Sequence, residues 1–300
     1  VRAVNPGALS PNGLAVDLGG RLDVSGTTIT VANLQNGLSG GGFIANSSGT
    51  TNGTLIVGTD DSSTAFDGVF GNGGSRPLDL AKVGAGTLTL SGVSTNTGTV
   101  TVTGGTLALT GSGSFNNAAK ISVGSGAFYD VAAAGGTLNL NNGQTLAGNG
   151  TVNGNVVASS GSTITPGSSV GTLTVAGNVS LSGNLVMELN RSLAPNSDRL
   201  AVSGGSITGG GNLTVTNIGA ALQVGDTFQL FTSGVSGITS TLPTVDVVNG
   251  LAYTWQDNIA GEPMRLLTRL PEGVPAYAEL DIWNPSSVRK QINKFLKDTH

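Results

Sequence analysis

The sequence contains no cysteine, few aromatic residues and few charges. Without cysteine, neither a disulfide framework nor a thiolate metal site can form. Charged residues make up only 10% of the chain and the formal net charge is -4, so a general nucleic-acid-binding surface is disfavoured. No stretch approaches the roughly 18 uninterrupted apolar residues of a membrane span, and we therefore expect no such span in this chain.

Histidine is almost absent as well. The one histidine is His300, the last residue, which excludes histidine-based catalysis or metal binding in the body of the chain. The sequence also lacks an EF-hand loop, the phosphate-binding GxxxxGK[ST] motif and a repeated glycine-rich calcium nonapeptide. We therefore predict no catalytic residue, no metal site and no cofactor.

The residues that are abundant favour β-structure. The chain has 49 glycines, and these with threonine, serine and asparagine make up almost half of its 300 residues. Glycine, serine, threonine and asparagine are poor helix formers, whereas threonine and valine suit strands, and glycine and asparagine suit turns. Since aromatics are only 4%, the core must be built from valine, leucine, isoleucine and alanine.

A recurring pentad gives the local pattern: glycine, then threonine or asparagine, then two apolar residues separated by any residue. Alternation with a period of two predicts that each pentad is a short strand with one face directed inward. The eight pentads are Gly53–Val57, Gly86–Leu90, Gly98–Val102, Gly105–Leu109, Gly136–Leu140, Gly171–Val175, Gly183–Met187 and Gly211–Val215.

The spacing of these strands indicates coils of about 20 residues, each with two or three strands, and on the order of 13 coils. Such a repeat cannot bury its own apolar face and must stack on its neighbours, which is the principle of a solenoid. An antiparallel sandwich is the main alternative, because Asn-Gly hairpin signals occur throughout the chain. The short runs, separated by one to four turn residues, favour an all-β parallel β-helix.

One stretch carries a resemblance to a known family. In Leu80–Leu109, the opening LAKVGAGTLTLSG and the close GGTLAL match the pattern of the autotransporter-associated β-strand repeat. The segments Thr165–Leu189, Ser197–Gly204 and Gly225–Phe231 resemble the sequence that often follows such repeats in bacterial surface proteins. The repeat match is clearest at 80–109 and 165–231, and the whole resemblance covers about residues 14–268.

The resemblance implies a right-handed parallel β-helix that is exported to the bacterial cell surface or beyond. Members are mostly passengers, stalks and adhesins, and the family has no catalytic signature to carry over. The chain begins with Val1 instead of methionine, which is consistent with removal of a signal peptide or with trimming. The printed sequence continues into neither the membrane barrel of an autotransporter nor a sorting tail, so we do not expect this chain to tether itself to the outer membrane.

The last 30 residues form a different kind of sequence. We predict a β-helix over residues 1–270 and a C-terminal segment over 271–300, which holds 8 charged residues and 1 glycine. Asn284-Pro285 predicts a helix start, and the helix is expected at about 285–298. It could cap the last coil, dock on a neighbouring subunit or partner, or lie on a membrane surface. The predicted docking residues are Tyr277, Ile282, Trp283, Val288, Ile292, Phe295 and Leu296.

The acidic residues are candidates for a catalytic site because parallel β-helices also host polysaccharide lyases, glycosidases and tailspikes. Glycoside hydrolysis needs two carboxylates across one cleft. Asp60, Asp61 and Asp67 lie in or near the turn TDDSST, where we expect solvated loop acids. For Glu188 and Asp198 we expect an ion pair between coils, since Asp198 precedes an arginine.

These observations favour a non-enzymatic extracellular scaffold, stalk or adhesin that associates either with itself, end to end into a fibre, or with cell-surface components. The alternative is a carbohydrate-binding or carbohydrate-cleaving β-helix similar to a tailspike or lyase. The chain could also be one segment of a longer passenger.

Overall fold

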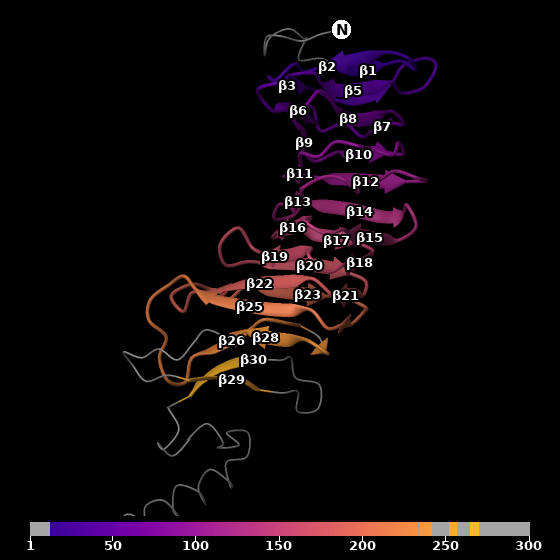
Figure 1. Cartoon of the computed structure of the whole chain (residues 1–300). Coiled ribbons are helices and arrows are strands. Elements are labelled where there is room, and N and C mark those ends of the chain that lie inside the picture. Colours follow the sequence, from indigo (N-terminus) through magenta and orange to yellow (C-terminus); the bar gives the residue numbers. More distant parts are fainter. Residues whose placement is uncertain (1–12, 233–234, 242–251, 257–264, 270–300) are drawn as a thin grey trace, which may run out of the picture.

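The computed structural model describes residues 13–232, 235–241, 252–256 and 265–269. In this part of the chain the protein is all-β, and parallel strands stack into a β-solenoid without a helix. Figure 1 shows the coils following one another along a single axis in chain order. The predicted parallel solenoid is confirmed, and the sandwich alternative is wrong because neighbouring coils pair in parallel.

The first face of the solenoid is one continuous parallel sheet of ten strands. In chain order they are β3 (Thr28–Val31), β6 (Gly53–Val57), β9 (Leu78–Lys82), β11 (Thr99–Val102), β13 (Lys120–Val123), β16 (Thr145–Gly148), β19 (Thr163–Pro166), β22 (Asn184–Leu189), β25 (Asn212–Asn217) and β28 (Thr239–Thr241).

The second face begins with a pair of strands and continues as a seven-stranded sheet. The pair is β1 (Leu14–Val16) and β4 (Leu34–Asn36), and the sheet contains β7 (Thr64–Phe66), β10 (Thr87–Leu90), β12 (Thr106–Thr110), β14 (Phe128–Ala133), β17 (Thr151–Asn153), β20 (Thr172–Ala176) and β23 (Arg199–Val202).

The third face is divided into two sheets. The first contains β2 (Arg21–Asp23), β5 (Phe43–Asn46) and β8 (Val69–Gly73), and the second contains β15 (Thr137–Leu140), β18 (Asn155–Ala158), β21 (Val179–Leu181), β24 (Ile207–Thr208) and β27 (Val235–Ser236). Between β8 and β15 the chain passes this face in irregular segments, joined by the bridge of Val93 with Ser114.

Coil length varies more than the spacing of the pentads suggested. From Thr145 to its partner Thr163 is 18 residues, whereas from Asn184 to its partner Asn212 is 28. The expected coil of about 20 residues is therefore near the short end of the observed range, and within the described residues the first face holds ten stacked strands, against the expected 13 coils. The additional residues lie in turns between faces, which tolerate insertions better than the paired strands do.

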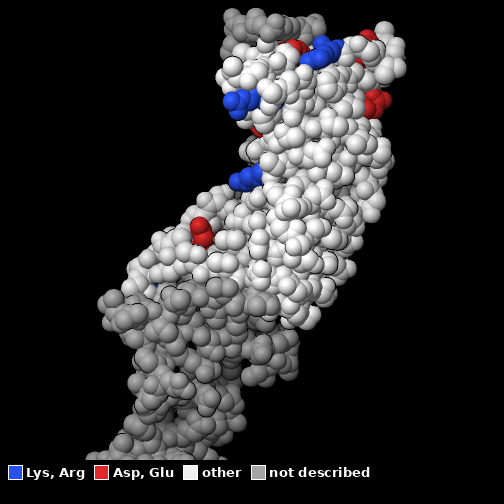
Figure 2. Space-filling model, viewed as in Figure 1, with Lys and Arg blue, Asp and Glu red and all other residues white. Residues whose placement is uncertain are grey.

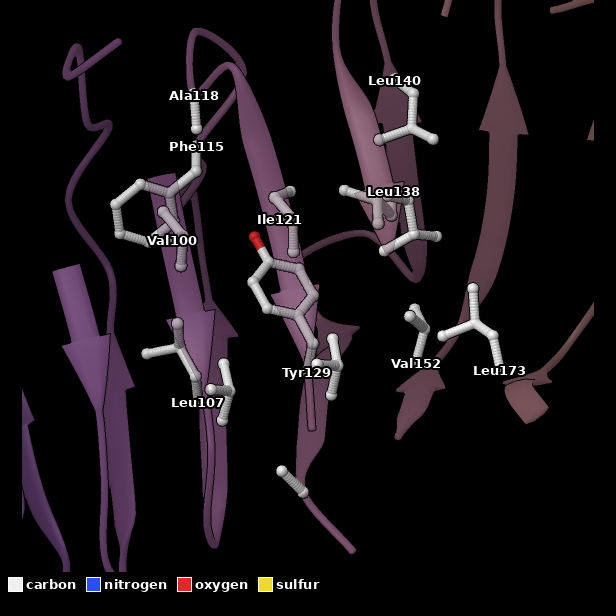
Figure 3. Close-up of a cluster of buried hydrophobic side chains, with 14 of the residues drawn as sticks. Val100, Leu107, Phe115, Ala118, Ile121, Tyr129, Leu138, Leu140, Val152 and Leu173 are labelled. Carbon is white, nitrogen blue, oxygen red and sulfur yellow. The ribbon is translucent and has the colours of Figure 1, made fainter. Parts of the chain in front are cut away.

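The core consists of columns of apolar side chains, because alternate residues of each strand point inward and the strands stack in register. Figure 3 shows part of this interior, with Val100 and Ile121 from the first face and Leu107, Tyr129, Val152 and Leu173 from the second. The inward column at the centre of the first face is almost fully buried and runs through Ile29, Leu55, Leu80, Val100, Ile121, Leu146, Ile164, Leu185 and Leu213.

The parallel winding ends in a small antiparallel sheet. Strand β26 (Thr227–Gln229) pairs with β30 (Arg265–Arg269), which also pairs with β29 (Ala252–Gln256). The repeat pattern did not predict this arrangement. The predicted C-terminal segment 271–300, its helix at about 285–298 and the proposed docking residues lie outside the described residues.

Candidate functional site

The first group of candidate acids lies on either side of β7, with Asp60 and Asp61 in the turn between β6 and β7 and Asp67 directly after β7. Asp60 is exposed and accepts hydrogen bonds from the Ser62 hydroxyl at 2.7 Å and from the Asn33 side-chain amide at 2.6 Å. These bonds, that from the Ser62 hydroxyl first, lower the pKa of the Asp60 carboxyl. The carboxylate therefore ties a turn to the preceding coil, and the predicted solvated loop acid is confirmed.

Its neighbours Asp61 and Asp67 act on other coils. Asp61 has a φ of 60° and accepts the backbone N–H of Ala85 at 2.6 Å, one coil further on. Asp67 is exposed and accepts the backbone N–H of Gly41, one coil earlier. Each acid thus bonds a different strand connection, and they do not form the facing pair that glycoside hydrolysis requires.

Glu188 and Asp198 are close together, but not as the predicted ion pair. Asp198 is only 1% exposed and accepts two backbone N–H groups, that of Glu188 at 2.7 Å and that of Gly171 at 2.9 Å. Burial raises the pKa of the Asp198 carboxyl to about 7, against the lowering effect of these two donors. The following arginine, Arg199, donates instead to the carbonyl of Gln229 at 3.4 Å. The ion-pair prediction is wrong because the carboxylate bonds backbone amides.

A shallow groove of about 290 Å³ crosses the outer surface of the first face next to this carboxylate. Lys120 on β13 and Glu188 on β22 both line it, together with the turn residues Pro166–Ser169. These two strands are three positions apart in the sheet, roughly 14 Å at the usual strand spacing, which is too far for a direct ion pair. The groove presents opposite charges at separate places and no pair of carboxylates.

Sequence reasoning missed the role of Lys82. This side chain occupies an inward position between Val57 and Val102 and is 1% exposed. Its ammonium donates to the carbonyls of Val83, Gly84 and Gly104 at 2.7, 3.0 and 3.2 Å. Burial lowers the pKa of Lys82, and the charge of Asp61 opposes this shift. The sequence did contain a signal for this role, because Lys82 is the lysine in the opening LAKVGAGTLTLSG of the repeat match.

Lys82, Asp61 and Asp198 have one function in common. Each is a charged group placed where the chain turns from the first face to the second, and each satisfies backbone donors or acceptors of adjacent turns. Burying a backbone N–H or C=O group without a hydrogen-bond partner costs free energy. These three side chains supply such partners at the corners, where glycines have no side chain that could do so.

Within the described residues, no three histidines or acidic side chains gather where they could hold a metal ion. The same part of the chain has no helix of the length and apolarity that a membrane crossing needs. Comparison with protein-family models returns no match, and no curated protein matches the chain significantly.

Proposed function

We propose that this protein is a non-enzymatic structural element of the bacterial cell surface or extracellular space, serving as a scaffold, stalk or adhesin. The observation that carries the proposal is the first face, in which ten strands form one unbroken parallel sheet over a continuous apolar column. Every coil is hydrogen-bonded to the next, so the chain forms an extended body whose length is set by the number of coils.

The outer surface supports the same role. Outward positions along the first face are mostly uncharged, as in the neighbouring residues Thr145, Thr163 and Asn184. Figure 2 shows charged side chains as isolated spots on an otherwise uncharged face. Threonine and asparagine rows favour the pleated sheet and its turns without forming a concentrated electrostatic site.

The proposed location rests on the resemblance to the autotransporter-associated repeat at Leu80–Leu109. The test is protease treatment of intact cells that produce the natural full-length protein. We expect the solenoid to be released or cleaved while a cytoplasmic marker stays intact. Protection of the solenoid until the cells are lysed would contradict the surface location.

The non-enzymatic character is proposed because four of the five candidate acids are held by hydrogen bonds of the turns. The runner-up is carbohydrate cleavage at these acids. Its test is incubation of the protein with a panel of polysaccharides, for which we expect no change in chain length. Cleavage that disappears on alanine substitution would overturn the proposal; the acids to substitute are Asp60, Asp61, Asp67, Glu188 and Asp198.

We also propose self-association through the ends of the solenoid and the C-terminal segment. A terminal strand such as β3 has a neighbour on only one side within the described residues, and such edges template further pairing. Electron microscopy of the purified protein should show end-to-end filaments that disappear when residues 288–300 are deleted. Filaments that survive the deletion would exclude a docking role for Val288, Ile292, Phe295 and Leu296.

A further inference from the structure

The third face is interrupted halfway along the solenoid. Strand β15 is the end strand of its sheet and pairs only with β18, although the coil before it passes the same face as residues 111–118. The two coils are joined at one corner by the side chain of Gln144, which donates to the carbonyl of Ala118 at 2.6 Å. Between residues 111–118 and β15 lies a cavity of about 310 Å³.

A β-bulge accompanies the interruption. The register of β12 with β14 shifts by one residue, since Ala108 faces Asp130 whereas Thr110 faces Ala133. Bulges redirect the chain and the side chains beside them. The additional residue of β14 lies between Asp130 and Ala133, and Val131 within this interval lines the cavity.

Tyr129 reaches the cavity from the second face. Its side chain is completely buried, and its hydroxyl has no hydrogen-bond partner. Figure 3 shows the ring directed into the interval between Phe115 and Leu138, with the hydroxyl at its tip. Burial raises the pKa of the Tyr129 hydroxyl, so the group remains a neutral donor at physiological pH. A buried polar group without a partner is rare and calls for one.

The rest of the lining is uncharged and divided by polarity. The apolar walls include Leu109, Phe115 and Leu138, which are buried. The mouth carries hydroxyl and amide groups from exposed residues of both coils, among them Ser112, Asn116 and Asn139. Small-ligand sites typically have this division, an apolar body with a few convergent polar groups, and volumes from about 300 Å³.

We propose that this cavity, between residues 111–118 and β15, binds a neutral saccharide unit, and that the side chains around the buried Tyr129 hydroxyl shift on binding so that a ligand oxygen accepts its proton. A sugar ring offers hydroxyls that both donate and accept, which matches serine, asparagine and tyrosine, and its C–H groups match the apolar walls. An anion or cation would find no opposite charge among the lining residues. Saccharide binding at this cavity goes beyond the proposed scaffold role. If no saccharide binds, the scaffold proposal is unaffected.

The test uses ligand-observed NMR on the purified full-length protein with methyl glycosides of glucose, galactose, mannose and N-acetylglucosamine as probes. We expect at least one probe to bind. Tyr129→Phe should weaken that binding roughly 3- to 10-fold through the loss of one hydrogen bond. The same variant should unfold at an unchanged or higher urea concentration, because it removes an unpartnered buried hydroxyl.

Ser112→Trp should close the mouth and abolish binding, while Ser160→Trp, also at an exposed turn serine but on another coil, should leave it unchanged. Three results would overturn the proposal: no probe binds, binding is equal in wild type and Ser112→Trp, or Tyr129→Phe binds as well as wild type. Binding of a blocked Thr-Val-Thr-Val peptide in place of the glycosides would reassign the cavity to strand pairing at β15.

Discussion

The carboxylate of Asp198 accepts the backbone N–H of Glu188 at 2.7 Å, and these two residues belong to the two sides of one chain reversal between β22 and β23. The second carboxylate oxygen accepts the N–H of Gly171 in the preceding coil at 2.9 Å. A single side chain thus joins three backbone segments at a corner of the solenoid. Because Asp198 is buried, its contribution can be measured without interference from solvent screening.

Asp198→Asn should lower the free energy of unfolding by about 1–3 kcal/mol at pH 8. An asparagine side chain has one acceptor oxygen, so one of the two N–H groups would face an amide donor instead. Urea unfolding followed by circular dichroism measures the effect. The control is Asp17→Asn at an exposed turn, where the asparagine Oδ1 can still accept the N–H of Ser39 and the change should stay within about 0.5 kcal/mol. Equal losses in both variants would argue against a special role for Asp198.

The pH dependence of stability follows from the raised pKa of Asp198. The folded-state pKa is about 7, whereas the ordinary pKa of an aspartate is 3.8, so between these values the folded protein holds a proton that the unfolded chain has lost. Stability from this group should therefore fall as the pH rises from about 4 to about 7. The melting temperature of wild type should therefore approach that of Asp198→Asn as the pH rises through this range while staying above it, and parallel profiles would contradict the raised pKa.

Lys82→Met should destabilise the solenoid by about 1–3 kcal/mol, because the three carbonyls that accept from the ammonium lose their donor. Methionine fills a similar volume, which isolates the hydrogen bonds from the packing. Lys120→Met, at an exposed position of the same face, is the matched control and should be nearly neutral. A more stable Lys82→Met protein would mean that desolvation of the charge outweighs its bonds.

Gly84→Ala should be more damaging than Gly126→Ala, although the two glycines have similar φ values of 69° and 73°. Both changes place a side chain in the left-handed region at a cost of about 1–2 kcal/mol. At Gly84 the new Cβ would also overlap the carbonyl oxygen of Gly58 in the adjacent coil, whereas at Gly126 nothing lies within 4 Å. Thermal unfolding should give Gly84→Ala the lower melting temperature, because this variant has the overlap with Gly58 in addition to the backbone strain that both share. Equal melting temperatures would show that the backbone around Gly84 moves enough to relieve the overlap.

Much of the fold was predictable because one pattern repeats. All eight pentads form strands, from Gly53–Val57 to Gly211–Val215, since alternation and glycine turns act locally. The pentads do not specify the face, however. β6 lies on the first face, β10 on the second and β15 on the third, although GTLIV, GTLTL and GTLNL are nearly the same sequence. The face depends on how many residues each turn uses, which the strand pattern does not encode.

The chemically unusual positions were less predictable. The neighbouring arginine suggested an ion pair for Asp198, but the partner amides come from residues 10 and 27 positions away. The cavity beside Tyr129 depends on a one-residue register shift and on the absence of a strand at 111–118. Both features arise from the stacking of particular coils. A pattern that is common to all the repeats does not describe how one coil differs from another.

The divided third face also has a mechanical consequence. Under tension along the chain, a solenoid unwinds coil by coil, and the resistance of each coil depends on how many of its faces are paired to the next. Most coils after β15 are paired on three faces, whereas the coils between β8 and β15 are paired to their neighbours through strands on two. A stretched molecule should therefore yield first in this interval and divide into two more strongly paired parts, so that the rod contains its own point of extension.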